Sequence, residues 1–344
     1  MAATDSPASL SELRTAFLNA LKETTGNSAI NTVVDRYLNM GLQDMHQERW
    51  WWAERRSTIR TNPPYTTGTI AVAVTDLTTR RTVTGTSTAW STANSFGDAN
   101  AVAAYKMSLG TTDVVHLIST VGSATSITLD TTTPYTGASA LSGESYAIWQ
   151  DEYGLAADFG DPLDMRFFDE DRRISLIGAQ EFYLQYARNS RRQAPKVATL
   201  IELGPSGSAA LRRRVVLGPA PDTTYIIPYR YYTTNLAVSS TGTGAANLSA
   251  AGDEPIVPLA FRMGIAWKGL ELWFSTRHKN AELAADFSNR YATTMLRARQ
   301  KSTSADDRPR IRPAVSSYWA TAKRPWQAGT RRYDGNAAFD EMRF

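Results

Sequence analysis

A long stretch in the first half of the sequence is rich in threonine and serine and poor in charge. Of the 85 residues at 66–150, 20 are threonine, 10 are serine and only eight carry a charge. Threonine is β-branched, which disfavours helix and favours the pleated surface of a sheet. Ile70, Val72 and Val74 also alternate with smaller or polar residues, which is the period of a strand. We therefore predict that residues 65–150 form a small all-β module of five to seven strands, a barrel or a sandwich.

Two helices are predicted before this module, in residues 1–64. Ser9 and Glu12 have the spacing of a capping box, in which the hydroxyl accepts from first-turn amides and the carboxylate reaches back. The apolar stripe of the second helix begins at Ile30 and, on this pattern, continues into three adjacent tryptophans at 50–52. Successive residues of a helix point to different sides. We therefore expect at least one of these rings to pack against another segment or another chain.

The longest helical pattern follows Pro258, a residue that suits the first turn of a helix. Apolar residues keep the helical period from Leu259 to Met295. One unbroken helix at 258–300 would have 43 residues and a length of about 65 Å, more than a single domain of this size needs. We predict an α+β fold: a helical bundle of the N-terminal helices and a long C-terminal helix (256–301), with the β module inserted between them.

The segment at 151–255 is predicted to mix strands and helix. Strands are expected at 197–203, 212–217 and 225–232, separated by Gly-Pro turns, and a helix is expected at 174–188.

A cluster of carboxylates in this segment is the strongest candidate for chemistry. Its members are Asp158, Asp161, Asp164, Asp169, Glu170 and Asp171. Such a cluster could bind a divalent cation or place two carboxylates for acid–base work. Pro162 and three neighbouring arginines favour turn caps and ion pairs instead, so we predict no catalytic residue, no metal site and no cofactor. The arginines at 212–214, on a predicted strand, could contact phosphates.

The last part of the sequence, 302–344, combines prolines, charge and large aromatic residues. Residues 306–313 are charged and broken by prolines, which favours an extended chain. A disordered tail is normally poor in aromatic residues, because nothing there buries them. We therefore predict an extended C-terminal arm that docks into grooves of its own body or of a neighbouring subunit. The candidate partner-binding residues are Trp50, Trp51, Trp52, Tyr318, Trp319, Trp326, Tyr333, Phe339 and Phe344.

The composition also narrows the possible activities. The chain has no cysteine, which excludes disulfide frameworks, CxxC zinc sites and thiol nucleophiles. Its three histidines lie far apart in the sequence, so we do not expect a histidine-rich metal centre. The P-loop, HExxH and GxSxG motifs are missing. No stretch approaches 18 uninterrupted apolar residues, so we expect no membrane span. The formal net charge is +4, and the basic excess lies entirely in the last 89 residues. We expect a structural protein and not an enzyme.

The order of several segments resembles the head-to-tail adaptor family of tailed bacteriophages. Residues 35–42, leading to the three tryptophans, look like the N-terminal helical region of these proteins. Residues 153–159 resemble their Leu-Pro-Ala-Asp-Phe segment, with Ala156 in place of the usual proline. The other matching segments are 83–90, 127–129, 134–137 and 146–150, which resemble the β insertion of many adaptors, and 228–232, which fits the tubular-tail relatives of short-tailed phages. The resemblance covers roughly residues 28–300.

This resemblance implies a ring of self-associated subunits, usually twelve, beneath the portal protein. Such a ring belongs to the neck of the virion, after assembly in the host cytoplasm, extends the channel for genome ejection and docks tail or nozzle proteins. DNA passes through the channel without sequence-specific binding.

Three other functions stay open from the sequence. The first is a tail, collar or baseplate component whose β module binds glycans. The second is a hydrolase that uses the carboxylates at 158–171. The third is a nucleic-acid-binding protein, whose DNA affinity would fall steeply with salt.

Overall fold

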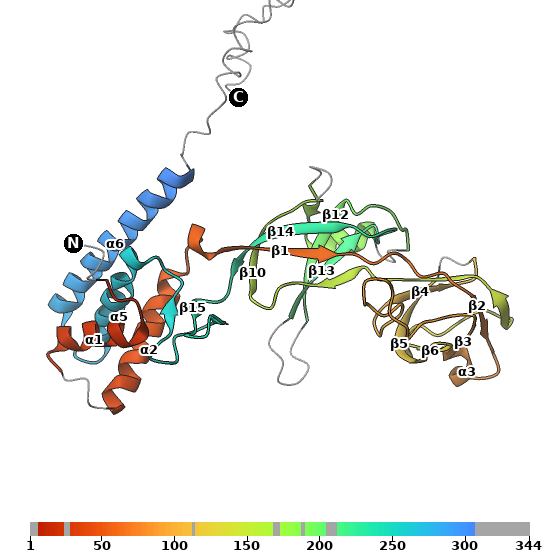
Figure 1. Cartoon of the computed structure of the whole chain (residues 1–344), viewed down its shortest axis with the longest axis horizontal. Helices are drawn as coiled ribbons and strands as arrows, with labels where there is room; N and C mark the ends of the chain where they lie inside the picture. The colour runs from red at the N-terminus through yellow and green to blue at the C-terminus, as the bar shows by residue number, and fades with distance from the viewer. Residues whose placement is uncertain are drawn as a thin grey trace, which may run out of the picture. The chain divides into compact units, whose positions relative to one another are not determined.

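The computed structural model describes residues 6–23, 28–111, 114–167, 173–186, 190–203 and 212–306 (Figure 1). These residues form six α-helices and several β-sheets, so the predicted α+β class is confirmed. The chain divides into two compact units. The first, a helical unit, combines Met1–Trp52 with Asn235–Phe344, and the second, a sheet unit, is Ala53–Thr234.

The helical unit is built from both ends of the sequence. Its elements are α1 (Leu10–Leu21), α2 (Ser28–Met45), a 3₁₀ turn η3 (Leu259–Phe261), α5 (Met263–Thr276) and α6 (Ala281–Asp306). α1 buries Leu10, Leu13 and Phe17 at the predicted helical spacing. The Ser9 hydroxyl does not cap this helix. The Glu12 carboxylate instead accepts a hydrogen bond from the backbone amide of the residue before Ser9, with an N···O distance of 2.6 Å.

α5 and α6 form a helical hairpin, so the prediction of one helix at 258–300 is wrong. The backbone turns at Lys279, which has a φ of 48°. The Asn280 side chain then accepts a hydrogen bond from a first-turn amide of α6 (3.1 Å), as an N-cap residue does. Phe274 of α5 stacks on Phe287 of α6, with 5.6 Å between ring centroids. Because both helices bury apolar residues at the same period, the spacing alone does not reveal the turn between them.

α2 and α5 cross at two glycines. A Cβ atom added at Gly41 would lie 2.6 Å from the carbonyl oxygen of Ile265, and one added at Gly269 would lie 3.1 Å from that of Tyr37. Both neighbours are helix backbone. The two helices therefore approach this closely because neither glycine has a side chain.

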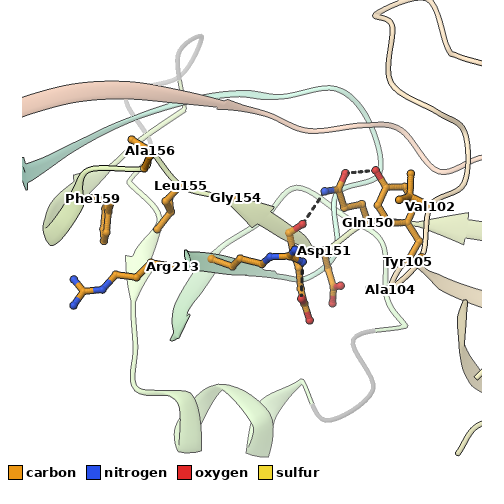
Figure 2. Close-up of a pocket in the computed structure, with 14 residues that line it drawn as sticks. Val102, Ala104, Tyr105, Gln150, Asp151, Gly154, Leu155, Ala156, Phe159 and Arg213 are labelled. Atoms are coloured by element: carbon orange, nitrogen blue, oxygen red, sulfur yellow. Dashed lines mark hydrogen bonds and ion pairs between the residues drawn. The ribbon is translucent and has the colours of Figure 1, made fainter. Parts of the chain in front are cut away.

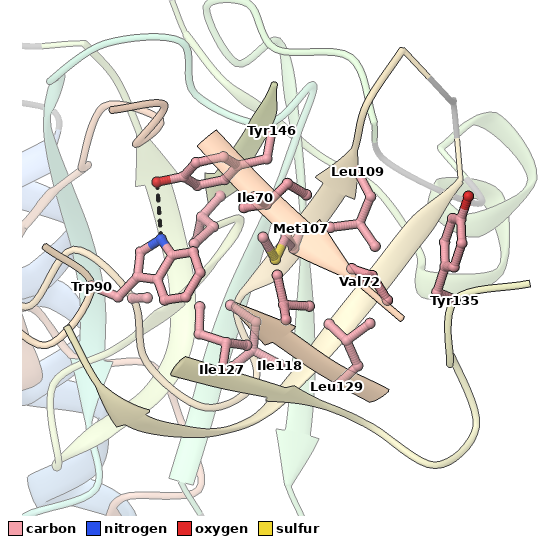
Figure 3. Close-up of a cluster of buried hydrophobic side chains, with 13 residues drawn as sticks. Ile70, Val72, Trp90, Met107, Leu109, Ile118, Ile127, Leu129, Tyr135 and Tyr146 are labelled. Atoms are coloured by element: carbon pink, nitrogen blue, oxygen red, sulfur yellow. Dashed lines mark hydrogen bonds between the residues drawn. The ribbon is translucent and has the colours of Figure 1, made fainter. Parts of the chain in front are cut away.

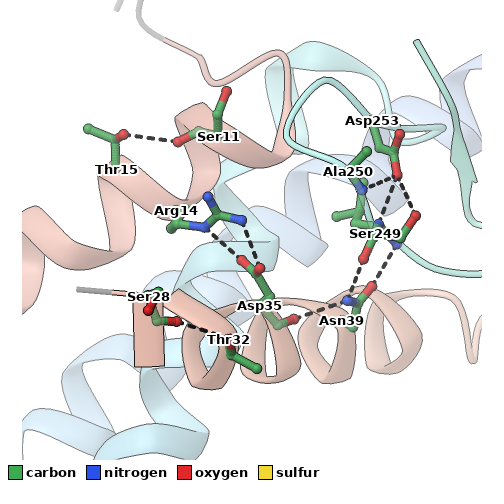
Figure 4. Close-up of polar contacts among 11 residues, drawn as sticks. Ser11, Arg14, Thr15, Ser28, Thr32, Asp35, Asn39, Ser249, Ala250 and Asp253 are labelled. Carbon is green, nitrogen blue, oxygen red and sulfur yellow. Dashed lines mark hydrogen bonds and ion pairs between the residues drawn. The ribbon is translucent and has the colours of Figure 1, made fainter. Parts of the chain in front are cut away.

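Polar side chains join α2 to α1 and to the loop that follows the sheet unit (Figure 4). This loop contains β15 (Ala237–Val238), β16 (Gly244–Ala245) and β17 (Glu254–Pro255). Asn39 of α2 accepts from the Leu248 amide (2.8 Å) and donates to its carbonyl (2.9 Å). The Asp253 carboxylate accepts from two loop amides, which lowers its pKa. Arg14 of α1 donates twice to Asp35 of α2, at 2.8 and 2.7 Å.

The threonine-rich segment forms one seven-stranded sheet, in the order β7-β2-β3-β6-β5-β4-β8. Its elements are β2 (Thr69–Val72), a short helix α3 (Leu77–Arg81), β3 (Thr82–Thr86), β4 (Lys106–Leu109), β5 (Val115–Ser123), β6 (Ser126–Leu129), β7 (Leu141–Glu144) and β8 (Tyr146–Trp149). Val83 and Gly85 of β3 are buried, whereas Thr84 and Thr86 are exposed. The number of strands is within the predicted five to seven.

The sheet curls around a core of its own (Figure 3). Trp90 is fully buried there, and its indole nitrogen donates to the Tyr146 hydroxyl (2.9 Å), which in turn donates to the Thr67 carbonyl (2.5 Å). His116 is also buried, and its Nδ1 lies 2.9 Å from the Thr133 carbonyl oxygen. Burial lowers the pKa of His116.

Two further sheets make up the rest of the sheet unit. One has the order β1-β14-β10, with β1 (Glu54–Arg60), β14 (Ile226–Thr233) and β10 (Phe159–Met165). The other has the order β11-β12-β13-β9, with β11 (Ser175–Leu176), β12 (Val197–Leu203), β13 (Arg212–Gly218) and β9 (Glu152–Gly154). The three strands predicted in this region are confirmed to within one residue at each end. The helix expected at 174–188 is shorter, α4 (Ala179–Gln185), because Ser175 and Leu176 pair in parallel with β12.

Candidate interaction surfaces

The sequence predicts that the three adjacent tryptophans continue α2. This prediction is wrong. α2 ends at Met45, and a separate 3₁₀ turn η2 begins at Trp51 (Trp51–Ala53). Trp50 and Trp52 are buried within the chain and stack on each other, with 4.5 Å between ring centroids. The Trp50 indole nitrogen donates to the Met45 carbonyl (2.6 Å). Trp51 is 44% exposed and meets the edge of Trp52, so it is the one of the three that offers a partner a surface.

The aromatic residues proposed as anchors on the C-terminal arm lie outside the described residues. They are Tyr318, Trp319, Trp326, Tyr333, Phe339 and Phe344. The arm was expected to begin at 302, but α6 continues to Asp306. Docking of the arm therefore stays a prediction for the residues after 306.

The outward side of α6 carries a strip of uncharged residues. Phe287, Met295 and Ala298 are buried against the helical unit, whereas the opposite side exposes Ala285, Asn289, Ala292 and Leu296. Leu296 is 54% exposed. We call these four exposed residues the α6 strip. They span about 17 Å of helix at about 1.5 Å per residue.

Two arginines near the α6 strip are engaged in ion pairs. Arg290 pairs with Asp286 one turn earlier (2.9 Å), and Arg299 pairs with Glu48, three residues after the end of α2. The four residues of the strip carry no charge, so covering them does not itself bury a charged side chain, which is the main cost of covering a helix face.

The carboxylate cluster is used for structure where the structure describes it. Asp158 accepts from the Tyr231 hydroxyl (2.7 Å) and from the Thr233 hydroxyl (2.6 Å). Asp164 accepts two hydrogen bonds from Arg230, at 2.9 and 2.7 Å, which lowers the pKa of Asp164. The ion-pair interpretation is confirmed for Asp164, whereas Asp158 is bound by two hydroxyl groups. Within the described ranges, no three His, Asp or Glu side chains are placed to hold a metal ion.

A cavity of about 620 Å³ lies in the sheet unit (Figure 2). Five of its lining residues belong to the segment that resembles the adaptor motif: Gly154, Leu155, Ala156, Ala157 and Phe159. The segment therefore contributes an apolar wall to a concave surface.

The other walls of the cavity come from the residues just before this segment and from two distant parts of the sequence, 102–105 and 213–214. Tyr105, in the loop before β4, donates to the Gln150 side chain (2.8 Å), and Gln150 donates to the Glu152 carbonyl (2.7 Å). Burial and the neighbouring Asp151 raise the pKa of Glu152. Arg214 of β13 lies 3.7 Å from the Glu152 carboxylate. Sequence reasoning missed this cavity because no motif links these segments before the chain folds.

The arginine run of β13 is also partly used inside the sheet unit. Arg213 donates to the Gly160 carbonyl, and Arg214 faces Glu152. Contact of this run with phosphates stays a prediction.

No described helix is both long and apolar enough to cross a membrane. The sequence matches no known protein-family model, and it matches no curated protein sequence.

Proposed function

We propose that this chain is a structural subunit of a ring at the head-to-tail junction of a tailed bacteriophage, placed between the portal and the tail. In this proposal the four α-helices of the helical unit (α1, α2, α5 and α6) form the bundle that builds the ring. The seven-stranded sheet is the inserted barrel-like module. The ring extends the DNA channel and presents a surface for tail or nozzle proteins.

The observation that carries the proposal is the α6 strip. A 26-residue helix that buries one side in its own unit and exposes Ala285, Ala292 and Leu296 on the other is suited to side-by-side packing of subunits. Small residues allow a neighbouring helix to approach within the usual 8–10 Å between axes. Burying a leucine side chain contributes about 1.5–3 kcal/mol. In a closed ring every subunit makes the same contact twice, so a modest pairwise affinity is multiplied into a stable assembly.

Two further features support the same function. The segment that resembles the adaptor motif lines a cavity with an apolar wall, which is a suitable place for an aromatic side chain of a docked arm. Trp51 keeps a large exposed ring at the surface of the helical unit. Both features are typical of a protein whose role is to hold neighbours.

The proposal is tested by measuring assembly of the full chain. We expect light scattering after size exclusion, together with electron microscopy, to show rings when the protein is mixed with the portal protein of the same phage. Leu296→Glu should abolish or strongly weaken the rings, because it places a charge on the α6 strip, within the proposed subunit interface.

Leu77→Glu is the matched control, because Leu77 is 59% exposed and lies on α3 of the sheet unit. It introduces the same charge and should leave assembly unchanged. A protein that remains a monomer and does not bind portal would contradict the proposal and favour a tail, collar or baseplate role. Equal effects of the two substitutions would contradict the role of the α6 strip.

A further inference from the structure

The outer face of the β1-β14-β10 sheet carries a group of arginines that no other part of the proposed function uses. The two faces of this sheet differ sharply. On the inner face, Tyr229 and Tyr231 of β14 point into the core and are 2% and 4% exposed. Arg230, between them, points to the other face, where Arg56 of β1 and Arg166 after β10 are exposed. The three arginines line a shallow hollow of about 420 Å³. The strands that carry this face, β1, β14 and β10, are labelled in Figure 1.

The pairing of the strands places two of these positive charges opposite each other. Arg56 and Arg230 are direct cross-strand partners. Like charges at such positions repel and destabilise a sheet. The Arg230 guanidinium is drawn to Asp164 (2.7 Å) and to Glu54 (3.1 Å). Arg56, in contrast, makes no ion pair and no side-chain hydrogen bond with any residue that the structure describes.

Among the residues that the structure describes, the remaining charges leave this face basic. Arg166 lies 3.5 Å from Asp164, a carboxylate that already accepts two hydrogen bonds from Arg230. Arg173, also exposed, is joined to Arg166 by an isolated backbone bridge. Four described guanidinium groups therefore share two described carboxylates, those of Glu54 and Asp164. Residues 168–172, which carry three further carboxylates and one arginine, lie outside the described residues.

We propose that this sheet face binds the phosphate backbone of nucleic acid without reading its sequence, with Arg56 and Arg166 as the principal contacts. Arginine matches phosphate because its planar group donates two parallel hydrogen bonds to the oxygens. Neighbouring strands are about 4.8 Å apart, so the row extends about 10 Å across the three strands. A row of this length on an open face suits an extended polyanion better than one small ion. Duplex DNA, with one charge per about 1.7 Å, supplies several phosphates over that distance.

The proposal does not depend on ring assembly, and it is tested on the full chain by itself. Fluorescence anisotropy with a labelled duplex of arbitrary sequence is measured over a series of NaCl concentrations. Each phosphate contact contributes about −0.9 to the slope of log K against log salt. Arg56→Gln should therefore reduce the steepness of that slope by about 1, and it should weaken binding roughly tenfold at low salt. Arg166→Gln should act in the same direction.

Arg290→Gln is the matched control. It removes the same formal charge from an exposed arginine, but that arginine is paired with Asp286 on α6 of the helical unit. It should leave the slope unchanged. Equal effects of the Arg56 and Arg290 substitutions, or no effect of either Arg56→Gln or Arg166→Gln, would overturn the proposal.

A second arm separates phosphate from carboxylate partners. Unlabelled duplex should displace the labelled duplex, whereas a poly-glutamate peptide of equal charge should not. Displacement by the peptide at the same concentration would assign this face to an acidic protein instead and would overturn the proposal. Portal binding is measured separately, so failure of the ring proposal would not change the outcome of this experiment.

Discussion

The crossing of α2 and α5 gives a sharp test of how the helical unit is packed. Gly41→Ala adds one methyl group at a point where a Cβ atom would lie 2.6 Å from the Ile265 carbonyl oxygen. The neighbour is helix backbone, which cannot rotate away as a side chain can, so the two helices must move apart. Overpacking of this kind costs about 1–3 kcal/mol, and a rigid neighbour places the cost near the upper end.

An opposing effect reduces this cost. Alanine is about 1 kcal/mol more favourable than glycine in a helix interior. The expected net loss for Gly41→Ala is therefore about 2 kcal/mol in the free energy of unfolding. With a urea m-value of about 2 kcal/mol/M, the unfolding midpoint of the helical unit should fall by about 1 M. Circular dichroism at 222 nm follows this transition, because the helices dominate the signal.

Gly264→Ala on α5 is the control for helix propensity. Its added Cβ would meet the side-chain methyl groups of Thr294 (3.1 Å) and Met45 (3.5 Å), which can shift by a few tenths of an ångström. We expect this variant to unfold at the same urea concentration as the wild type or slightly above it. If Gly41→Ala is as stable as the wild type, or if both variants lose the same stability, the close helix crossing is not what holds α2 and α5 together.

Three further predictions concern single contacts. Because burial lowers the pKa of His116, the unfolded chain takes up a proton more readily than the folded one. The melting temperature of the sheet unit should therefore fall as the pH drops below about 6.5. Calorimetry should show a weaker pH dependence of the melting temperature for His116→Gln. A wild-type melting temperature that is constant from pH 7 to 5 would contradict this. Trp90→Phe removes the hydrogen bond to Tyr146 and part of the core volume, so urea unfolding should show a loss of about 1–3 kcal/mol; a loss below 0.5 kcal/mol would show that the bond and the volume matter little. Asn39→Ala removes both bonds to Leu248 and should cost about 1–2 kcal/mol, with faster protease cleavage of the loop at 239–252; unchanged cleavage would mean that other contacts hold the loop.

Elements with a strong local period could be predicted closely from the sequence. The strand expected at 197–203 coincides with β12, and the apolar spacing from Leu10 to Phe17 marks the buried side of α1. In both cases the residue pattern repeats with the period of the element, so the prediction does not depend on the rest of the fold.

Features that depend on where the chain turns could not be predicted in the same way. The break before α6 has no glycine or proline, and its one local signal is Asn280 followed by a helix-forming run. Likewise, α2 ends before the tryptophans, and the stacking of Trp50 on Trp52 follows from that end. A period shared by two neighbouring elements conceals the boundary between them.

The surfaces that we propose for binding were the least visible in the sequence. Arg56 and Arg230 are separated by 173 residues and become neighbours only through the register of β1 and β14. The cavity walls come from three separate segments. In β14, the position of Arg230 between two buried tyrosines was a weak signal for the first of these surfaces, and the cavity had none.

The origin of the helical unit in both ends of the chain has a consequence during synthesis on the ribosome. α1 and α2 emerge first, but α5, which α2 packs against at Gly41, begins only at Met263. At about 5–20 residues per second, the nascent N-terminal helices wait roughly 10 to 40 seconds for this partner. The sheet unit, in contrast, is continuous and can fold in that interval. α6 is synthesised after the N-terminal helices and the sheet unit. In the proposed ring, a subunit can therefore offer the α6 strip to a neighbouring subunit only when nearly all of its own chain has been made.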